Sequence, residues 1–463
     1  MKYPNGKGDS LMKWSSTSRT VSIYVLLLAS ISGQAVAADQ TNGNESDDAS
    51  YSLFDNSPNS RATLTGDWGG VRTYLRNKGI EFGASWTNET AGNVTGGDRH
   101  TAAQTNQITA GLDVNAEKLL HWKGASFNFT FTWRSGRNLI TDAGLYTLQQ
   151  PQEVWGRGQT TRLTQLWYKQ NLGSGFSFKV GRLPTGADFD NVPCLTMVNY
   201  FCGATTGNMD GSRWLNWPVS VWGGLVKYNN PRWYFQAGAY EQNDRNLDNY
   251  LFIGYLHGAT GVLLPFETGL RVHLGAHGYP GAYRIGGWIN TAPAADVLLA
   301  SNGQPAAMAG MSMLERSGSH GGYLWFQQQL TGTFTETPGE DAIVTQGLTA
   351  YVTLTMVDKE TGPVSSQVTA SLRYLGLPGR KHDAVTLAFG TNHVNSRLAT
   401  LDWYQAGKKG PRRDSEFAIE TDYTAQVTKW LYLEPNIQFW VDPGGYTQKS
   451  MITVLGLKTG VTF

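Results

Sequence analysis

Charged side chains recur at alternate positions in several segments of this sequence, and these residues could do chemistry. The set contains both signs: Arg134, Lys179, Arg271 and Arg373 are basic, and Glu416, Glu420, Asp422 and Glu434 are acidic. A wall with facing charges sets up a transverse field, and arginine, aromatic and amide groups can exchange hydrogen bonds with neutral polar solutes. For any single residue, a solvated position with no specific role is the alternative.

Catalytic motifs are missing from the sequence. It contains no hydrolase elbow, zinc-binding helix motif, phosphate loop or dinucleotide fingerprint. Ser319 and His320 are adjacent in a glycine-rich segment, which is typical of a solvated loop, and the eight histidines are scattered. We therefore expect no enzyme, no catalytic residue, no metal site and no cofactor.

The two cysteines, Cys194 and Cys202, lie close together in one polar segment of the chain. The seven residues between them include no His, Asp or Glu, and this spacing matches none of the zinc motifs. We expect a short-range disulfide, with a free or metal-bound pair as the alternative.

Residues 1–37 predict export from the cytoplasm. Basic residues precede an apolar run at 21–31, and Ala35-Val36-Ala37 follows as a cleavage signal. The run is much shorter than the roughly 20 apolar residues of a membrane-spanning helix. Cleavage would remove four basic residues and one acidic residue, so the formal charge of +1 becomes −2. A near-neutral chain of this kind indicates no nucleic-acid partner.

Residues 38–79 predict an N-terminal periplasmic segment. Residues 38–60 are polar and suggest a weakly ordered lead-in. After them, Asp67 could cap a short helix that carries Val71 and Leu75 on one face, and Gly79 could end it. A plain surface helix before the first strand is the alternative.

From residue 80 to residue 463 the dominant signal has a period of two. In 127–134 the odd positions are aromatic and the even positions are polar. The chain has 55 glycines and only 16% charged residues, which is typical of strands and turns. These features predict an all-β fold, a transmembrane antiparallel β-barrel of about 16 strands. Four long gaps between the strands fit extracellular loops: 135–160, 184–219, 241–267 and 290–320.

The last strand-like segment, 451–463, gives the clearest single pattern. Leu455, Leu457 and Phe463 share one face, while Lys458 lies on the other. We expect the outward face to meet outer-membrane lipid, and the terminal Phe463 to be the signal that the barrel-assembly machinery reads. An edge strand of a secreted β-sandwich is the alternative, although sixteen similar strands would be many for one sandwich.

Four motifs resemble the carbohydrate-selective porins of the OprB type. The opening motif Gly66-Asp67-Trp68-Gly69-Gly70-Val71-Arg72 with Gly79-Ile80 is long and specific, as is Leu431–Gln438 followed by Asp442-Pro443-Gly444-Gly445. Two weaker matches lie between them: Arg162–Tyr168 with Val180-Gly181-Arg182, and the segment from Cys194 to Gly203. The resemblance runs from about Leu64 to Phe463.

The resemblance implies a sixteen-stranded barrel with a short N-terminal helix, loops folded into the channel, and passive diffusion of glucose-like sugars. On this basis we expect Arg134, Arg137 and Arg182 to contact sugar hydroxyls where loops 135–160 and 184–219 narrow the path. The expected pore-lining set is Arg134, Arg137, Lys179, Arg182, Asp188, Arg271, Arg373, Glu420 and Glu434. A general or non-sugar channel and a secreted carbohydrate-binding protein are the alternatives. Both a monomer and a homotrimer fit the sequence.

Overall fold

The structure is a computed structural model that describes residues 63–463 apart from 249–250 and 252–256. The expected leader at 1–37 and the lead-in at 38–60 lie outside these residues. Among the helices that the structure describes, none has the length and apolar character needed to cross a membrane.

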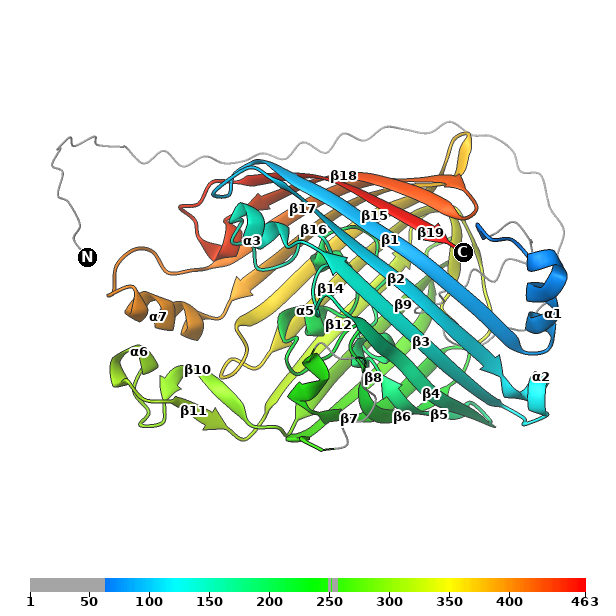
Figure 1. Cartoon of the computed structure of the whole chain (residues 1–463), viewed down its shortest axis with the longest axis horizontal. Helices are drawn as coiled ribbons and strands as arrows, with labels where there is room; N and C mark the ends of the chain where they lie inside the picture. The colour runs from blue at the N-terminus through cyan, green and yellow to red at the C-terminus, as the bar shows by residue number, and fades with distance from the viewer. Residues whose placement is uncertain (1–62, 249–250, 252–256) are drawn as a thin grey trace. The chain divides into compact units, whose positions relative to one another are not determined.

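Sixteen long antiparallel strands in the described residues form one closed barrel (Figure 1). They are β1 (Ile80–Thr95), β2 (Ala102–Asn115), β3 (Ala125–Gly136), β4 (Thr161–Gly173), β5 (Phe176–Leu183), β6 (Val221–Asn229), β7 (Trp233–Gln242), β8 (Gly261–Leu274), β9 (Tyr279–Asn290), β12 (Ser319–Gln329), β14 (Ile343–Val357), β15 (Val364–Leu377), β16 (Arg380–Val394), β17 (Ser415–Thr428), β18 (Leu431–Val441) and β19 (Ile452–Thr462).

The first and last strands close the barrel. β19 pairs with β1 in antiparallel register, with Trp86 opposite Val461 and Glu89 opposite Lys458. Closure leaves no edge strand between β1 and β19. The predicted barrel is therefore confirmed, and the sandwich alternative is wrong.

Side-chain burial in the barrel is inverted relative to a water-soluble protein. On β19, Leu455 is 49% exposed, whereas Lys458 is 6% exposed. On β17, Ile419 is exposed while Glu420 and Asp422 are buried. Apolar groups thus face outward and charged groups face the interior, as expected for a barrel in lipid.

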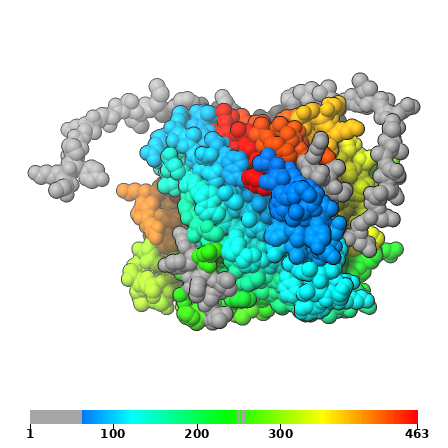
Figure 2. Space-filling model, turned by 45° about the vertical axis from the view of Figure 1, so that its right-hand side comes forward, coloured from blue at the N-terminus to red at the C-terminus, as the bar shows by residue number. Residues whose placement is uncertain are grey.

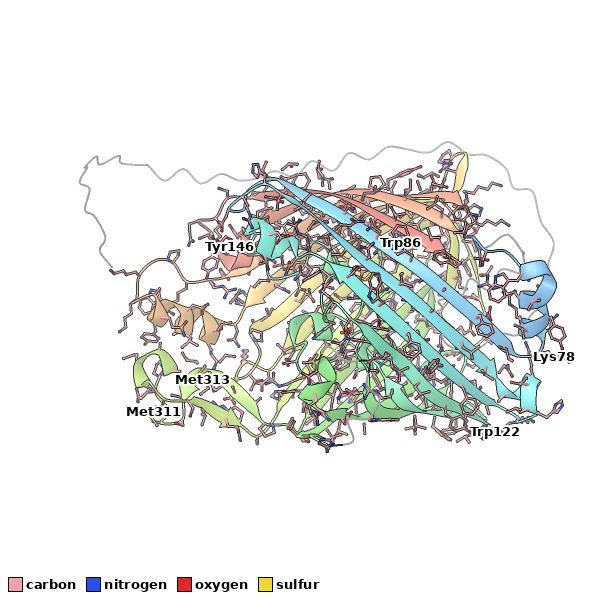
Figure 3. All side chains as sticks on the ribbon, in the orientation of Figure 1. Lys78, Trp86, Trp122, Tyr146, Met311 and Met313 are labelled. Atoms are coloured by element: carbon pink, nitrogen blue, oxygen red, sulfur yellow. A yellow bond between two sulfur atoms is a disulfide. The ribbon has the colours of Figure 1, made fainter. Side chains whose placement is uncertain are left out.

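The two ends of the barrel differ in the length of their connections. Short turns join the strands at one end, such as residues 378–379 between β15 and β16, while long segments such as 184–220 join them at the other. Lys78 and Trp122 mark the short-turn end, and Met311 and Met313 mark the long-loop end (Figure 3). In outer-membrane barrels the short turns are periplasmic and the long loops are extracellular.

The predicted N-terminal helix is present as η1 (Trp68–Gly70) and α1 (Val71–Asn77). The Asp67 carboxylate accepts a 2.8 Å hydrogen bond from the Thr73 backbone N–H, and Gly79 ends the helix with φ of +88°. Arg72 donates hydrogen bonds to the backbone oxygens of Phe82, at 2.9 Å, and Phe463, at 2.8 Å. The helix is therefore tied to the barrel seam, and Figure 2 shows it beside the C-terminal residues.

Two predicted loops contain more structure than expected. β8 begins at Gly261, so the connection predicted at 241–267 ends earlier; adjacent apolar residues such as Leu263 and Leu264 hide the alternation there. The segment predicted as loop 290–320 holds a hairpin, β10 (Ala294–Ala300) with β11 (Met313–Arg316).

The smaller elements are α2 (Ala116–Leu120), α3 (Leu139–Ala143), α4 (Thr185–Asp188), η2 (Asn199–Phe201), α5 (Thr205–Met209), η3 (Asp244–Leu247), α6 (Ala306–Ala309), β13 (Thr333–Thr335), α7 (Ser396–Gln405) and η4 (Pro443–Gly445).

Candidate functional site

Residues 137–160, between β3 and β4, fold into the barrel and are called the first inward loop. The Leu148 backbone N–H donates to a Glu416 carboxylate oxygen at 2.8 Å. The Gln152 side chain donates to the Glu89 backbone oxygen at 2.7 Å, and Gln438 donates to the Pro151 carbonyl at 3.0 Å. The loop therefore lies against the inner wall formed by β1, β17 and β18.

Residues 184–220, between β5 and β6, form the second inward loop. The Glu420 carboxylate accepts hydrogen bonds from the backbone N–H groups of Met197, at 3.1 Å, and Val198, at 2.9 Å. The Tyr200 hydroxyl donates to Glu416 at 3.0 Å. Two carboxylates of β17 thus hold this loop, and Glu420 lies behind it with no exposed surface.

The same loop is also held by a distant part of the wall. The Asp190 backbone N–H donates to Glu267 of β8 at 3.0 Å, and the Asp190 carboxylate accepts from the Thr206 N–H at 2.7 Å. Burial raises the pKa of Asp190 to about 7, against the lowering effect of its hydrogen bonds with Thr206 and Thr205. With contacts to both β8 and β17, the second inward loop crosses the lumen and narrows it.

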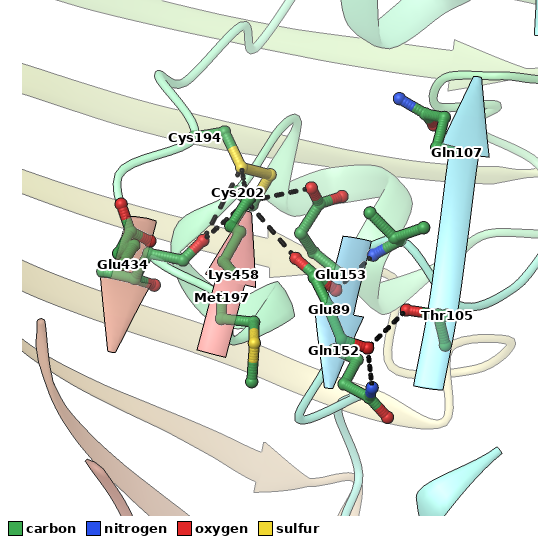
Figure 4. Close-up of polar contacts among 12 residues, drawn as sticks. Glu89, Thr105, Gln107, Gln152, Glu153, Cys194, Met197, Cys202, Glu434 and Lys458 are labelled. Carbon is green, nitrogen blue, oxygen red and sulfur yellow. Dashed lines mark hydrogen bonds and ion pairs between the residues drawn. A yellow bond between two sulfur atoms is a disulfide. The ribbon is translucent and has the colours of Figure 1, made fainter. Parts of the chain in front are cut away.

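A disulfide joins Cys194 and Cys202 within the second inward loop. Beside it, the Lys458 ammonium of β19 lies 3.1 Å from Glu153 of the first inward loop and 3.3 Å from Glu89 of β1 (Figure 4). It also donates to the Thr196 carbonyl at 3.4 Å. One buried lysine therefore joins the wall to both inward loops.

Four arginines gather where the two inward loops meet: Arg134, Arg157, Arg162 and Arg182. Arg157 of the first inward loop donates to the Gly211 carbonyl of the second at 2.7 Å, and its own carbonyl accepts from Arg162 at 2.9 Å. Burial, and then the charges of Arg134 and Arg162, lower the pKa of Arg157 to about 10. We call this group the arginine cluster.

Neighbouring oxygens fix the guanidinium groups of the arginine cluster. Arg162 donates to the carbonyls of Asn246 and Leu247 at 3.1 and 3.0 Å. Arg182 donates to the Asn246 side chain at 2.9 Å, and Arg134 donates to Gln107 at 2.8 Å. These bonds hold rigid, planar hydrogen-bond donors at the narrowing.

Other predicted site residues lie elsewhere on the inner wall. Lys179 pairs with Asp188 at 2.5 Å and lies 5.0 Å from the centre of the Trp167 ring. Arg373 donates to the Leu195 carbonyl of the second inward loop at 3.4 Å. These side chains attach the second inward loop to β5 and β15.

Three predicted residues lie away from the arginine cluster. Arg271 pairs with Asp341, at 3.0 Å, in the connection before β14. Glu434 accepts a 2.9 Å hydrogen bond from Thr424. The Arg137 side chain is 66% exposed beyond the end of β3 and pairs with Asp142 at 2.7 Å.

At the long-loop end, Asp296 of β10 ties the β10–β11 hairpin to α7. Its buried carboxylate lies 2.6 Å from Arg316 of β11 and 2.6 Å from Arg397 of α7. Burial raises the pKa of Asp296, but the N–H groups of Leu299 and Leu298 and the two arginines outweigh this, so that the pKa falls to about 2.

This low pKa predicts that acid releases the hairpin. An unfolded aspartate has a pKa of about 3.9, so the contact stabilises the hairpin above that pH and loses its effect as the pH falls through about 2. We expect pepsin to cleave near Leu298 faster at about pH 1.5 than at about pH 3.5, after normalisation to an unstructured peptide. Asp296→Asn should abolish the difference, and equal wild-type rates at the two pH values would contradict the prediction.

Comparison with known proteins agrees with this architecture. The family model described as carbohydrate-selective porin, OprB family, matches residues 99–463. Porin B of Pseudomonas aeruginosa is 38% identical over 429 residues, covering 88% of this chain and 92% of its own length. The putative porin QuiX of Acinetobacter baylyi is 30% identical over 429 residues, covering 87% and 93%. The high-pH structure of Pseudomonas putida OprB superposes with a TM-score of 0.81 at 36% identity, covering 88% of this chain and 99% of that one.

Proposed function

Because this chain belongs to the OprB family of carbohydrate-selective porins, we propose that its arginine cluster is the filter through which neutral sugars pass. The protein is a porin of the bacterial outer membrane, and its fold is that of a channel. Sugars move through it down their own concentration gradient. No energy source is required.

The position of Arg157 carries the proposal. It lies in the first inward loop and bonds to the second, so the arginine cluster marks the narrowing between them. Guanidinium groups offer fixed donors to sugar hydroxyls. One aromatic ring accompanies them, since the Arg182 guanidinium lies 5.8 Å from the centre of the Trp222 ring. Fixed donors beside a ring suit a solute that has hydroxyl groups and an apolar face.

Liposome swelling tests the proposal. Replacing Arg157 with Gln removes one fixed charged donor, and a hydrogen bond to a charged group is worth about 1.5–3 kcal/mol, so we expect monosaccharide flux to fall about tenfold. The flux of an uncharged non-sugar solute of similar size should change much less. Arg232→Gln, at the exposed turn between β6 and β7, removes the same charge and serves as the control.

Two outcomes would favour the alternatives. A wild-type channel that passes all solutes of equal size equally would indicate a general diffusion channel. A channel that excludes monosaccharides while passing other solutes of their size would contradict sugar selection. Either result would contradict the proposed role of the arginine cluster as a sugar filter, and neither would affect the assignment of the fold as a barrel.

The arrangement of β19 is consistent with a role of the C-terminus in assembly of the barrel in the outer membrane. β19 presents Leu455 and Leu457 outward, and α1 holds the Phe463 backbone through Arg72. We infer that the barrel-assembly machinery recognises this strand before the Arg72 contact forms. Phe463→Ala should lower the yield of heat-modifiable protein in the outer membrane, while Val427→Ala, on an outward face of β17, should not.

A further inference from the structure

The longest connection at the short-turn end of the barrel, among the described residues, joins β12 to β14 across residues 330–342. Within it β13 pairs with the start of β14, with Thr335 opposite Ile343, so residues 336–342 form its tip. The other described turns at this end are shorter, such as 378–379. We call residues 336–342 the exit loop, because the short-turn end of an outer-membrane barrel faces the periplasm.

The exit loop folds against the inner face of the barrel wall. Its Asp341 carboxylate pairs with Arg271 of β8, at 3.0 Å, and with Arg284 of β9. The neighbouring residues Leu270 and Ile285 are 53% and 56% exposed on the outer face, so the alternation of the strands points both arginines into the lumen. Asp341 therefore lies inside the barrel.

A second contact carries the exit loop further around the rim. The Gly339 carbonyl accepts a 2.8 Å hydrogen bond from the side chain of Asn229, at the end of β6. Arg271 also donates to the Asn229 side chain, at 3.1 Å. Around the barrel β6 is the fourth strand from β12, which is about 19 Å along the wall. The exit loop thus takes up part of the periplasmic mouth.

Arg284 joins the exit loop to the narrowing. One terminal nitrogen of its guanidinium donates to Asp341, and the other donates to the Asn191 carbonyl of the second inward loop at 3.0 Å. The planar guanidinium fixes both directions at once. The next residue, Val192, is buried in one cluster with Trp325, and the Arg284 guanidinium lies 4.2 Å from the centre of the Trp325 ring. The second inward loop is therefore docked at the place where the exit loop is tied.

A second carboxylate near Arg284 is engaged by other donors. The charge of Glu267 also acts on Arg284. The Glu267 oxygens, however, accept hydrogen bonds from the Asp190 backbone N–H, at 3.0 Å, and from the Tyr323 hydroxyl, at 2.9 Å. Asp341 is thus the carboxylate that accepts directly from the guanidinium and directs it.

We propose that Asp341 is a positioning residue for the channel's narrowing and acts through Arg284 on the second inward loop. The loop is then held from two sides, because Glu416 and Glu420 hold it from β17 and the exit loop holds it from the periplasmic end. Loss of the Asp341 charge frees the guanidinium to turn away from the Asn191 carbonyl. The width of the path depends on this contact whichever solute the channel carries.

Single-channel recordings of the purified full-length protein in planar bilayers, with KCl as the only solute, test this role. Asp341→Asn keeps the size of the side chain and removes its charge. A hydrogen bond to a charged group shifts an equilibrium about tenfold or more, so we expect the fraction of time spent in larger-conductance states to rise about tenfold. Asp341→Glu restores the carboxylate and should lie closer to the wild type.

A matched control and a double variant separate this role from simple loosening of the exit loop. Glu336→Gln removes a carboxylate from the same loop, where it pairs with His273 in an exposed position, and should leave the recordings unchanged. Arg284→Gln should have at least the effect of Asp341→Asn, and adding Asp341→Asn to it should increase that effect no further.

Heat-modifiable migration in gels identifies the variants whose barrel is intact. Wild-type recordings from Asp341→Asn would overturn the proposal, as would equal changes in Asp341→Asn and Glu336→Gln. Additive effects of Asp341→Asn and Arg284→Gln would show that Asp341 acts on the exit loop alone, and would equally contradict it. If Arg284→Gln does not fold, Asp341→Glu decides, since an increase equal to that of Asp341→Asn would exclude a role of the charge.

Discussion

Replacing Glu416 with alanine is expected to widen the channel and to destabilise its narrow form. This carboxylate accepts hydrogen bonds from Leu148, Tyr200 and Gly444, which belong to three different long-loop connections. Alanine leaves each buried donor without an acceptor, at about 1–3 kcal/mol per donor. Both inward loops lose a wall contact in the same variant. We expect higher and noisier single-channel conductance, and faster liposome swelling with disaccharides.

A graded control separates loop release from general damage. Tyr200→Phe removes only one of the three hydrogen bonds to Glu416, so its conductance should lie between those of the wild type and Glu416→Ala. Heat-modifiable migration in gels would show that the barrel is intact in both variants. Wild-type conductance in Glu416→Ala would contradict the assignment of these loops to the narrowing.

Most of the barrel could be predicted because each strand alternates residues that suit lipid on one face with residues that suit the interior on the other. In β3, Phe129 and Phe131 alternate with Thr130 and Thr132, and the pattern is local to the segment. The extended closing strand and its outward Leu455 and Leu457 were predictable for the same reason. The alternation is absent at Leu263, Leu264 and Pro265, where apolar residues and a proline occupy both faces. The predicted loop therefore extends to residue 267 and includes the first seven residues of β8, which begins at Gly261.

The candidate site was less predictable because it depends on which inward-facing charges the loops cover. Alternation places Glu420, Arg271 and Arg134 on the same inner wall, but only the folded loops bury Glu420 beneath Met197 and Val198. Arg157 and Arg162, which complete the arginine cluster, fell outside the predicted set. Arg157 lies in an irregular segment with no periodic signal, and its role follows from a contact with Gly211, 54 positions away.

Arg137 belongs to the predicted site residues but lies outside the arginine cluster. The family resemblance implies a place for it at the narrowing, yet β3 ends at Gly136 and the Arg137 side chain is 66% exposed and pairs with Asp142 of the same loop. A shift of one or two residues at a strand end decides whether a side chain faces the lumen or the loop. Sequence periodicity does not fix strand ends to that precision.

Replacing Lys458 with methionine is expected to be the most destabilising single change in the barrel wall. The ammonium is buried, lies 3.1 Å from Glu153 and 3.3 Å from Glu89, and is the cross-strand partner of Glu434. Removing one member of a buried ion pair leaves the other charge uncompensated, at about 3–5 kcal/mol. The urea midpoint for loss of heat-modifiable migration should therefore fall well below that of the wild type.

A double variant tests whether the loss in Lys458→Met comes from the charge left on Glu89. Adding Glu89→Gln to Lys458→Met removes one stranded charge, so the double variant should recover about 1–3 kcal/mol relative to additivity. Lys429→Met, at the exposed turn between β17 and β18, provides the matched control, since it removes the same charge from a solvated position. Equal losses in Lys458→Met and Lys429→Met would show that the buried ammonium is not what joins the wall to the two inward loops.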